Sequence, residues 1–270
     1  MNNKMSPIFK ISFSALFIAI GIVLSRFAGI AITPFLNISL SPSIVMFSSL
    51  YLGPVYGFVV GTLTDVLGAL LFPKGAFNPL YTIAASLTGL IPFLAYFFLR
   101  KTKFEEKYPF IGTTICIIFS IAIVFFCIFN NQISSEYGTK KYELLTWHKV
   151  LLISLAVILS SLFVFLCLFI PKKLKDRKFN KYYSINLIAS SVFITYFIFK
   201  IPVGSLVQSY LMEVDFLLVF TMRMLTGFLT AFVHIVVISL ALDVSLHFNV
   251  QGTLLNPDYM RLRKVFNETK

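Results

Sequence analysis

Two arginines are placed where they could bind an anionic group of a ligand. Arg26 ends the first long apolar run, and Arg223 lies inside the last one, after Phe216. A guanidinium group presents a planar fork of N–H donors that matches the two oxygens of a carboxylate. Two alternatives stay open: Arg26 could reach interfacial water, and Arg223 could pair with Asp65 or Asp215.

Aromatic and amide side chains form a second candidate site at the start of the fourth apolar run. Phe77 and Tyr81 offer flat surfaces for stacking, Asn78 can both donate and accept hydrogen bonds, and Lys74 adds a cation. A flat heteroaromatic ring would use all of these groups. The alternative is that the two aromatic residues belong to an interfacial aromatic belt.

The sequence lacks the residue patterns of the common enzymes. Its three histidines are too scattered for a metal site, and we expect no cofactor. No phosphate-binding loop, zinc-hydrolase motif or nucleophile elbow is present, so ATP hydrolysis must come from another polypeptide. An intramembrane enzyme would need paired acid and base groups. Asp65 is the only acidic residue deep in an apolar run apart from Asp243.

The composition requires a membrane protein. Hydrophobic residues make up 58% of the chain, charged residues make up 13%, and the mean hydropathy is +0.88. Apolar runs of about 20 residues predict transmembrane helices, since only helices and closed barrels satisfy the backbone in lipid. The net charge of +12 sits mostly in loops, which argues against nucleic acid. We interpret three cysteines as packing residues: Cys116, Cys127 and Cys167.

The apolar runs predict an all-α, polytopic helical bundle in the cell membrane with about eight transmembrane helices. If both termini are cytoplasmic, 16 of the 23 basic residues fall on inner segments, as the positive-inside rule requires. One embedded domain, 1–248, is followed by a basic tail, 249–270, which we expect to lie along inner headgroups. The predicted spans are 8–28, 38–52, 54–72, 79–99, 110–129, 149–170, 183–199 and 216–243.

The third run carries a stripe of small residues with one carboxylate. Gly53, Gly57 and Gly61 recur every four residues, and Asp65 and Ala69 continue the same helical face. Small residues let two helices approach closely, and a carboxylate within a bilayer needs a protein partner. This stripe should therefore face protein and not lipid.

The run DVLGALLFPKGAFNPLYTIAASLTGLI, residues 65–91, resembles the third and fourth helices of a known family. That family comprises the substrate-binding S components of energy-coupling-factor (ECF) vitamin transporters, and the folate-specific branch is the most similar. The likeness extends back to the first helix, ALFIAIGIVLSRF, residues 15–27, and resumes weakly over 204–242.

The resemblance implies a fold, a ligand and partners. S components typically have six helices, so residues 104–175 are the candidate insertion, a helical hairpin. The expected function is capture of a folate-like vitamin on the outer side, followed by uptake with a transmembrane T component and two ATPase subunits. In such proteins an A-x-x-x-A face on the first helix docks onto the T component, and Ala15 and Ala19 match it. An S component for another vitamin and a structural membrane subunit are the alternatives.

The segment before the last helix departs from the folate branch. The branch's N-T-L-W-L run falls on residues 204–208, which puts Gly204 at its Asn position and Val207 at its Trp position. Gln208 and Tyr210 are nearby and could substitute. The expected outward-facing segments are 34–41, 74–81 and 204–215, with Arg26 and Arg223 completing a cationic ring.

The predicted topology can be tested by thiol labelling in a variant that lacks the three native cysteines. A new cysteine at Gly138 should react with an impermeant reagent in intact cells, because this loop is predicted to lie outside. Cysteines on the inner side should resist the reagent, and we choose Lys103, Lys107 and Lys178. Strong labelling of these three would contradict the topology.

Overall fold

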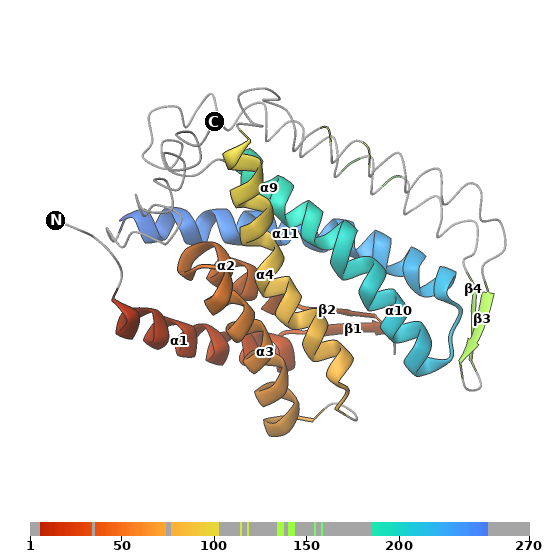
Figure 1. Cartoon of the computed structure of the whole chain (residues 1–270). Coiled ribbons are helices and arrows are strands. Elements are labelled where there is room, and N and C mark those ends of the chain that lie inside the picture. The colour runs from red at the N-terminus through yellow and green to blue at the C-terminus, as the bar shows by residue number, and fades with distance from the viewer. Residues whose placement is uncertain are drawn as a thin grey trace, which may run out of the picture.

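The structure is a computed structural model that describes residues 6–33, 36–73, 77–102, 134–137, 140–143 and 185–247, with the isolated positions 114, 118, 154 and 158. These residues form a helical bundle with two short β-hairpins (Figure 1). The elements are α1 (Pro7–Arg26), β1 (Ile30–Thr33), β2 (Leu36–Ile38), α2 (Ser41–Leu52), α3 (Pro54–Leu71), α4 (Pro79–Lys101), β3 (Ser134–Tyr137), β4 (Lys140–Glu143), α9 (Ile185–Ile194), η1 (Thr195–Lys200), α10 (Ile201–Met212) and α11 (Phe216–His247).

The predicted fold class is confirmed. Five described helical stretches are long and apolar enough to cross a membrane: 7–26, 54–71, 79–101, 185–212 and 216–245. The apolar helix α2 is shorter, with 12 residues. The hairpin expected at 104–175 is described only at β3 and β4, which pair antiparallel, and at four single positions. The tail 249–270 lies outside the described residues.

Local sequence signals set the helix starts. Four helices carry a proline at the first or second position, where its missing N–H is not needed: Pro7, Pro42, Pro54 and Pro79. Asn78 caps α4, because its Oδ1 accepts a hydrogen bond from the backbone N–H of Leu80 at 2.9 Å. The predicted candidate binding residue Asn78 therefore also has a structural role.

Glycines bring α3 and α4 into backbone contact. A Cβ added at Gly89 would collide with the carbonyl oxygen of Gly57, and one at Gly61 would collide with that of Ala85. Neither carbonyl can move without shifting its helix. The predicted protein-facing stripe on α3 is confirmed at these positions, and its partner is α4.

Polar pairs continue the same contact between α3 and α4. The hydroxyls of Thr62 and Ser86 lie 2.7 Å apart. Thr82 Oγ1 donates to Asp65 Oδ2, also at 2.7 Å. Asp65 thus has the protein partner that a carboxylate in a membrane helix requires.

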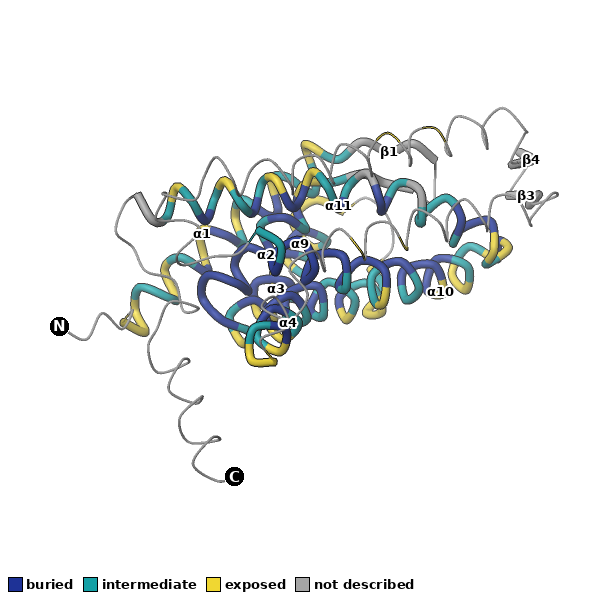
Figure 2. Tube along the Cα trace, turned by 90° about the horizontal axis from the view of Figure 1, so that it is seen from above, coloured by how far each residue is buried: buried dark blue, intermediate teal, exposed yellow. Residues whose placement is uncertain are grey.

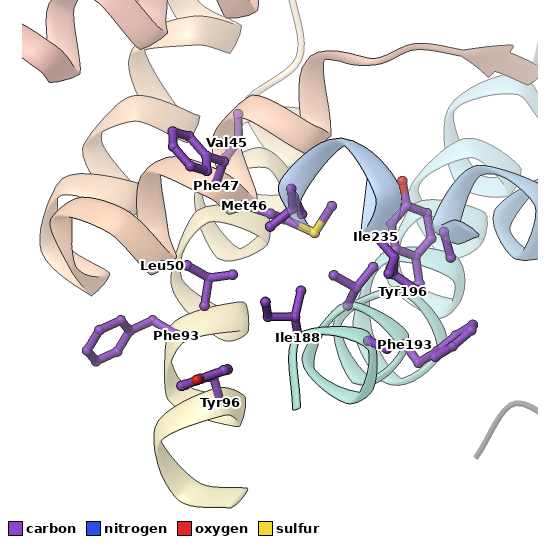
Figure 3. Packing of buried hydrophobic residues seen from close by; sticks show 14 of the residues in the cluster. Val45, Met46, Phe47, Leu50, Phe93, Tyr96, Ile188, Phe193, Tyr196 and Ile235 are labelled. Atoms are coloured by element: carbon purple, nitrogen blue, oxygen red, sulfur yellow. The ribbon is translucent and has the colours of Figure 1, made fainter. Parts of the chain in front are cut away.

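The hydrophobic core forms around α2. Of its 12 residues, ten are buried, which explains why this short helix has no polar face. Figure 3 shows side chains of α2, α4, α9 and α11 gathered around one centre, among them Met46, Leu50, Ile188 and Phe193. Along the helices, buried positions alternate with exposed positions on the opposite side (Figure 2). The outward positions are mainly apolar, as lipid contact requires.

Contacts between helices fix their relative directions. Arg26 packs on Gly68 and Gly21 on Thr64, so α1 and α3 run parallel. The α3–α4 contacts are antiparallel. The end of α1, the loop after α3, the start of α4 and the turn between α10 and α11 therefore share one end of the bundle, which we call the Arg26 end. The hairpin β1–β2 follows Arg26, and β2 contacts α11.

The stretch 185–212 is one continuous helix, which corrects the predicted span 183–199 (Figure 1). Segment 204–215, expected to face outward, is helical up to Met212. Pro202 removes an N–H, and its ring presses on the carbonyl four residues earlier. The π-helical turn η1 accommodates the proline by widening the helix, and the N–H of Ile201 bonds to the carbonyl of Tyr196.

Close packing of α3 on α4 makes the seam intolerant of side chains. We expect Gly89→Ala to destabilise the protein by about 1–3 kcal/mol, since the Cβ meets rigid backbone. The measurement is the thermal unfolding temperature of the purified protein in detergent. Ala15→Leu on the exposed face of α1 is the control and should leave this temperature unchanged. Equal unfolding temperatures for Gly89→Ala and the unaltered protein would contradict the packing.

Candidate functional site

Three of the predicted site residues meet in one hydrogen-bond network at the Arg26 end. Gln208 Oε1 on α10 accepts from the hydroxyl of Tyr81 on α4 at 2.7 Å. The same oxygen accepts from Arg223 Nη2 on α11 at 2.8 Å. Gln208 is buried, with 5% of its surface exposed. The network orients a phenol, an amide and a guanidinium group from three helices toward one point.

A glycine makes room for the guanidinium group. A Cβ added at Gly204 would collide with Arg223 Nη1, so any larger residue here would displace the arginine. Arg223 Nε is buried and makes no hydrogen bond within the described part of the chain. The guanidinium therefore has a donor to spare in a region with little water, and an anion would use it.

Arg26 lies at the same end on the opposite pair of helices. Its guanidinium packs on Gly68 of α3, where an added Cβ would be 3.2 Å from Nε. Nε is buried and lacks a hydrogen-bond partner among the described residues. Beside it, the rings of Phe27 and Phe72 meet edge to face with centroids 5.2 Å apart. Arg26 is thus held by packing, and one of its donors is unused.

The alternative pairing of Arg223 with an acidic residue gains no support from the observed contacts. Asp65 bonds to Thr82, and Asp215 Oδ1 accepts from the N–H of Leu217 at the start of α11. The hydrogen bond observed for Arg223 goes instead to the neutral amide of Gln208.

The other predicted site residues are not joined to this network by any observed contact. Tyr210 is 79% exposed and shares the outward face of α10 with Leu206, one turn away. Phe77 lies two residues before the start of α4 and is 51% exposed. Lys74 lies outside the described residues. The contribution of these three to a site stays a prediction.

The sequence analysis missed one residue of interest, Lys200. The predicted span 183–199 would leave it just past a helix end, but it ends η1 in the middle of the continuous helix. Its Nζ donates to the hydroxyl of Tyr196 at 2.9 Å and lies 4.5 Å from the centre of that ring. Tyr196, Lys200 and Gly204 are spaced by four residues, as on one face of a helix. This spacing is the signal in the sequence that could have predicted a helix through Lys200.

The small-residue face of α1 is uncovered. Ser12, Ala15 and Ala19 are all exposed, and Ile8 and Ile11 next to them are 77% and 62% exposed. The described helices of this chain do not pack on that stripe. Its role in binding another subunit remains a prediction.

Comparison with known proteins gave one family and one relative. Residues 9–142, about half of the chain, match the family described as "ECF transporter, substrate-specific component". Over 94 residues the chain is 33% identical to the folate transporter FolT of Clostridium novyi (strain NT), covering 35% of this chain and 54% of that protein. The chain thus spans about half the length of this relative. No solved structure matches it.

Proposed function

Because the chain belongs to the family of substrate-specific components of ECF transporters, we propose that it captures a folate-like vitamin for uptake. In this proposal it binds the vitamin at the Arg26 end, which faces the cell exterior. A T component and two ATPase subunits then drive release into the cell. The chain itself is a multi-pass membrane protein and supplies recognition, not energy.

The Tyr81–Gln208–Arg223 network is the observation that carries this proposal. A folate molecule has a flat pterin ring at one end and a glutamate with two carboxylates at the other. The phenol and amide suit the ring, and the guanidinium suits a carboxylate. The unused donor at Arg223 Nε supports an anionic ligand, because a buried unpaired N–H is costly. The folate transporter of Clostridium novyi, as a relative, favours this vitamin.

Orientation and partner binding rest on two further features. The Arg26 end is proposed to face outside, because 16 of the 23 basic residues fall on predicted inner segments. The described members of this set, Lys10, Arg100 and Lys101, lie at the opposite end of the bundle. The exposed small residues of α1 leave a narrow groove that a helix of another subunit can approach closely. This face is the proposed site of the T component.

Other functions fit less well. A different vitamin remains the main alternative, because Gly204 and the buried Val207 stand where the folate branch has Asn and Trp. An intramembrane enzyme would need an acid and a base around a cleft, whereas the deep carboxylate of Asp65 bonds to Thr82. A structural subunit would not need the donors that converge at Gln208.

Substitution of Arg223 tests the carboxylate contact. We expect Arg223→Ala to weaken folate binding by about 2 kcal/mol or more, a factor of roughly 30. Binding of a pterin fragment without the glutamate should be nearly unchanged. The measurement is a calorimetric or fluorescence titration of both ligands. Equal losses for the two ligands would overturn the role of Arg223, and no folate binding by the unaltered protein would favour another vitamin.

A matched pair of tyrosines provides the control for this experiment. Tyr81→Phe removes the hydroxyl that bonds to Gln208, so it should weaken both folate and the pterin fragment. Tyr56→Phe removes a hydroxyl at the opposite end of the bundle, where the Tyr56 ring lies 5.4 Å from Lys10 Nζ, and should change neither affinity. Equal effects of the two substitutions would argue against the network as the binding site.

Substitutions on α1 test coupling to the other subunits. Replacing both Ala15 and Ala19 with Leu fills the groove on the exposed face. The purified protein should bind its ligand with unchanged affinity, because the site lies on other helices, while vitamin uptake by cells collapses. Uptake at the normal rate in the double variant, at equal protein level, would contradict the coupling role.

A further inference from the structure

Lys200 is a cation in the middle of a membrane helix. Met212 ends this helix, and at 1.5 Å per residue Lys200 lies about 18 Å from that end. The hydrocarbon core is about 30 Å thick, so this depth is close to its centre. Charged side chains are rare at such depth, and where they occur they usually serve substrate or ion binding. The π-helical turn η1, which Lys200 ends, is also a feature that recurs at functional sites.

The observed contacts of Lys200 do not neutralise its charge. Its hydrogen bond goes to the hydroxyl of Tyr196, a neutral acceptor. Tyr196 in turn stacks on His234, with ring centroids 5.4 Å apart, and His234 Nδ1 bonds to Ser43 Oγ. The surroundings on this side are therefore aromatic and hydroxylic. They orient the ammonium group but supply no negative charge.

A second cation lies on the other side of Lys200. Arg223 is close enough to interact with it electrostatically. The Arg223 guanidinium packs directly on Gly204, and Lys200 lies one helical turn before Gly204 on the same face of the helix. Two like charges near each other in a medium with little water repel strongly, and an anion between them would remove the repulsion.

Unused hydrogen-bond donors mark the same place. An ammonium group has three donors, and the observed hydrogen bond of Lys200 uses one. Arg223 Nε is buried without a partner in the described residues. Buried donors without partners are uncommon in proteins. A ligand rich in oxygen atoms would satisfy them.

We propose that Lys200 is a second cationic substrate ligand, positioned beneath Arg223, and that the two together bind a ligand carrying two carboxylates. This inference rests on the proposed function, because it places the dicarboxylate end of a folate-like molecule deep in the bundle. The ring of the ligand then lies toward Tyr81 and Phe77 at the Arg26 end. Glycine at position 204 lets the Arg223 guanidinium pack directly against this helix, on the face that carries Lys200 one turn earlier.

The test compares folate with its diamide, in which both carboxylates are neutral amides. Lys200→Met should weaken folate binding by a factor of roughly 30 or more and leave diamide binding unchanged. Lys200→Gln can still bond to Tyr196 and should show the same loss, whereas Lys200→Arg should retain most of the affinity. Lys101→Met, at the opposite end of the bundle, is the control and should bind folate normally.

Two outcomes would overturn the role of Lys200. One is unchanged folate affinity in Lys200→Met or Lys200→Gln. The other is an equal loss for folate and the diamide, which would mean a packing role only. If neither Lys200→Met nor Lys200→Gln can be purified, the binding of the two folate monoamides to the unaltered protein tests the two-cation site. Each should bind at least about tenfold more weakly than folate, and a monoamide that binds as tightly would contradict a two-cation site.

A fragment separates failure of this inference from failure of the proposed vitamin. Glutarate carries two carboxylates but no ring. It should raise the unfolding temperature of the unaltered protein and not that of Lys200→Gln. If folate does not bind but this difference is seen, the vitamin assignment fails and the two-cation site stands. If folate does not bind and glutarate stabilises both proteins equally or neither, both proposals fail.

Discussion

The cost of a polar group in the membrane governs this structure. Without water, a buried donor, acceptor or charge needs a partner from the protein or a ligand. The described helices meet this requirement through pairs such as Asp65 with Thr82. The described exceptions include four hydroxyls and one imidazole nitrogen, and the two charged groups among them are Arg26 and Arg223, each with an unpaired buried Nε. These two arginines lie at one end of the bundle, which is why we propose that a ligand binds there.

Glycine makes both the scaffold and the site possible. Along the α3–α4 seam, Gly57 and Gly89 let two backbones touch, which fixes the helix that carries Tyr81. At the Arg26 end, Gly68 and Gly204 leave space that guanidinium groups occupy. The same absence of a side chain therefore serves helix packing in one place and positions a cation in the other.

The sequence predicted the helical bundle and the protein-facing α3 stripe, because apolar length and small-residue spacing are local signals. It named Tyr81, Gln208 and Arg223 as candidate binding residues, but not the hydrogen bonds that join them. It did not predict the helix across Pro202. Proline usually ends a helix, and the π-turn that accommodates it depends on tertiary packing of η1 against α11. The predicted span 183–199 therefore left Lys200 at an outer helix end and not in the middle of a helix. The same error hid the direction of Tyr210. In a helix, a residue two positions after the buried Gln208 points to the opposite, outward side.

The buried donors around Gly204 also bear on specificity. A site that holds unpaired N–H groups rejects ligands without matching acceptors more strongly than an apolar pocket rejects a ligand of the wrong size, because the donors stay unsatisfied. In the folate branch this position has an asparagine side chain, which brings its own acceptor. In this chain Gly204 supplies none, and the space belongs to Arg223. Gln208 already accepts from Nη2 of Arg223. Under the proposed function the acceptor for Nε comes from the ligand, so discrimination by charge should be stronger here than with the amide in place.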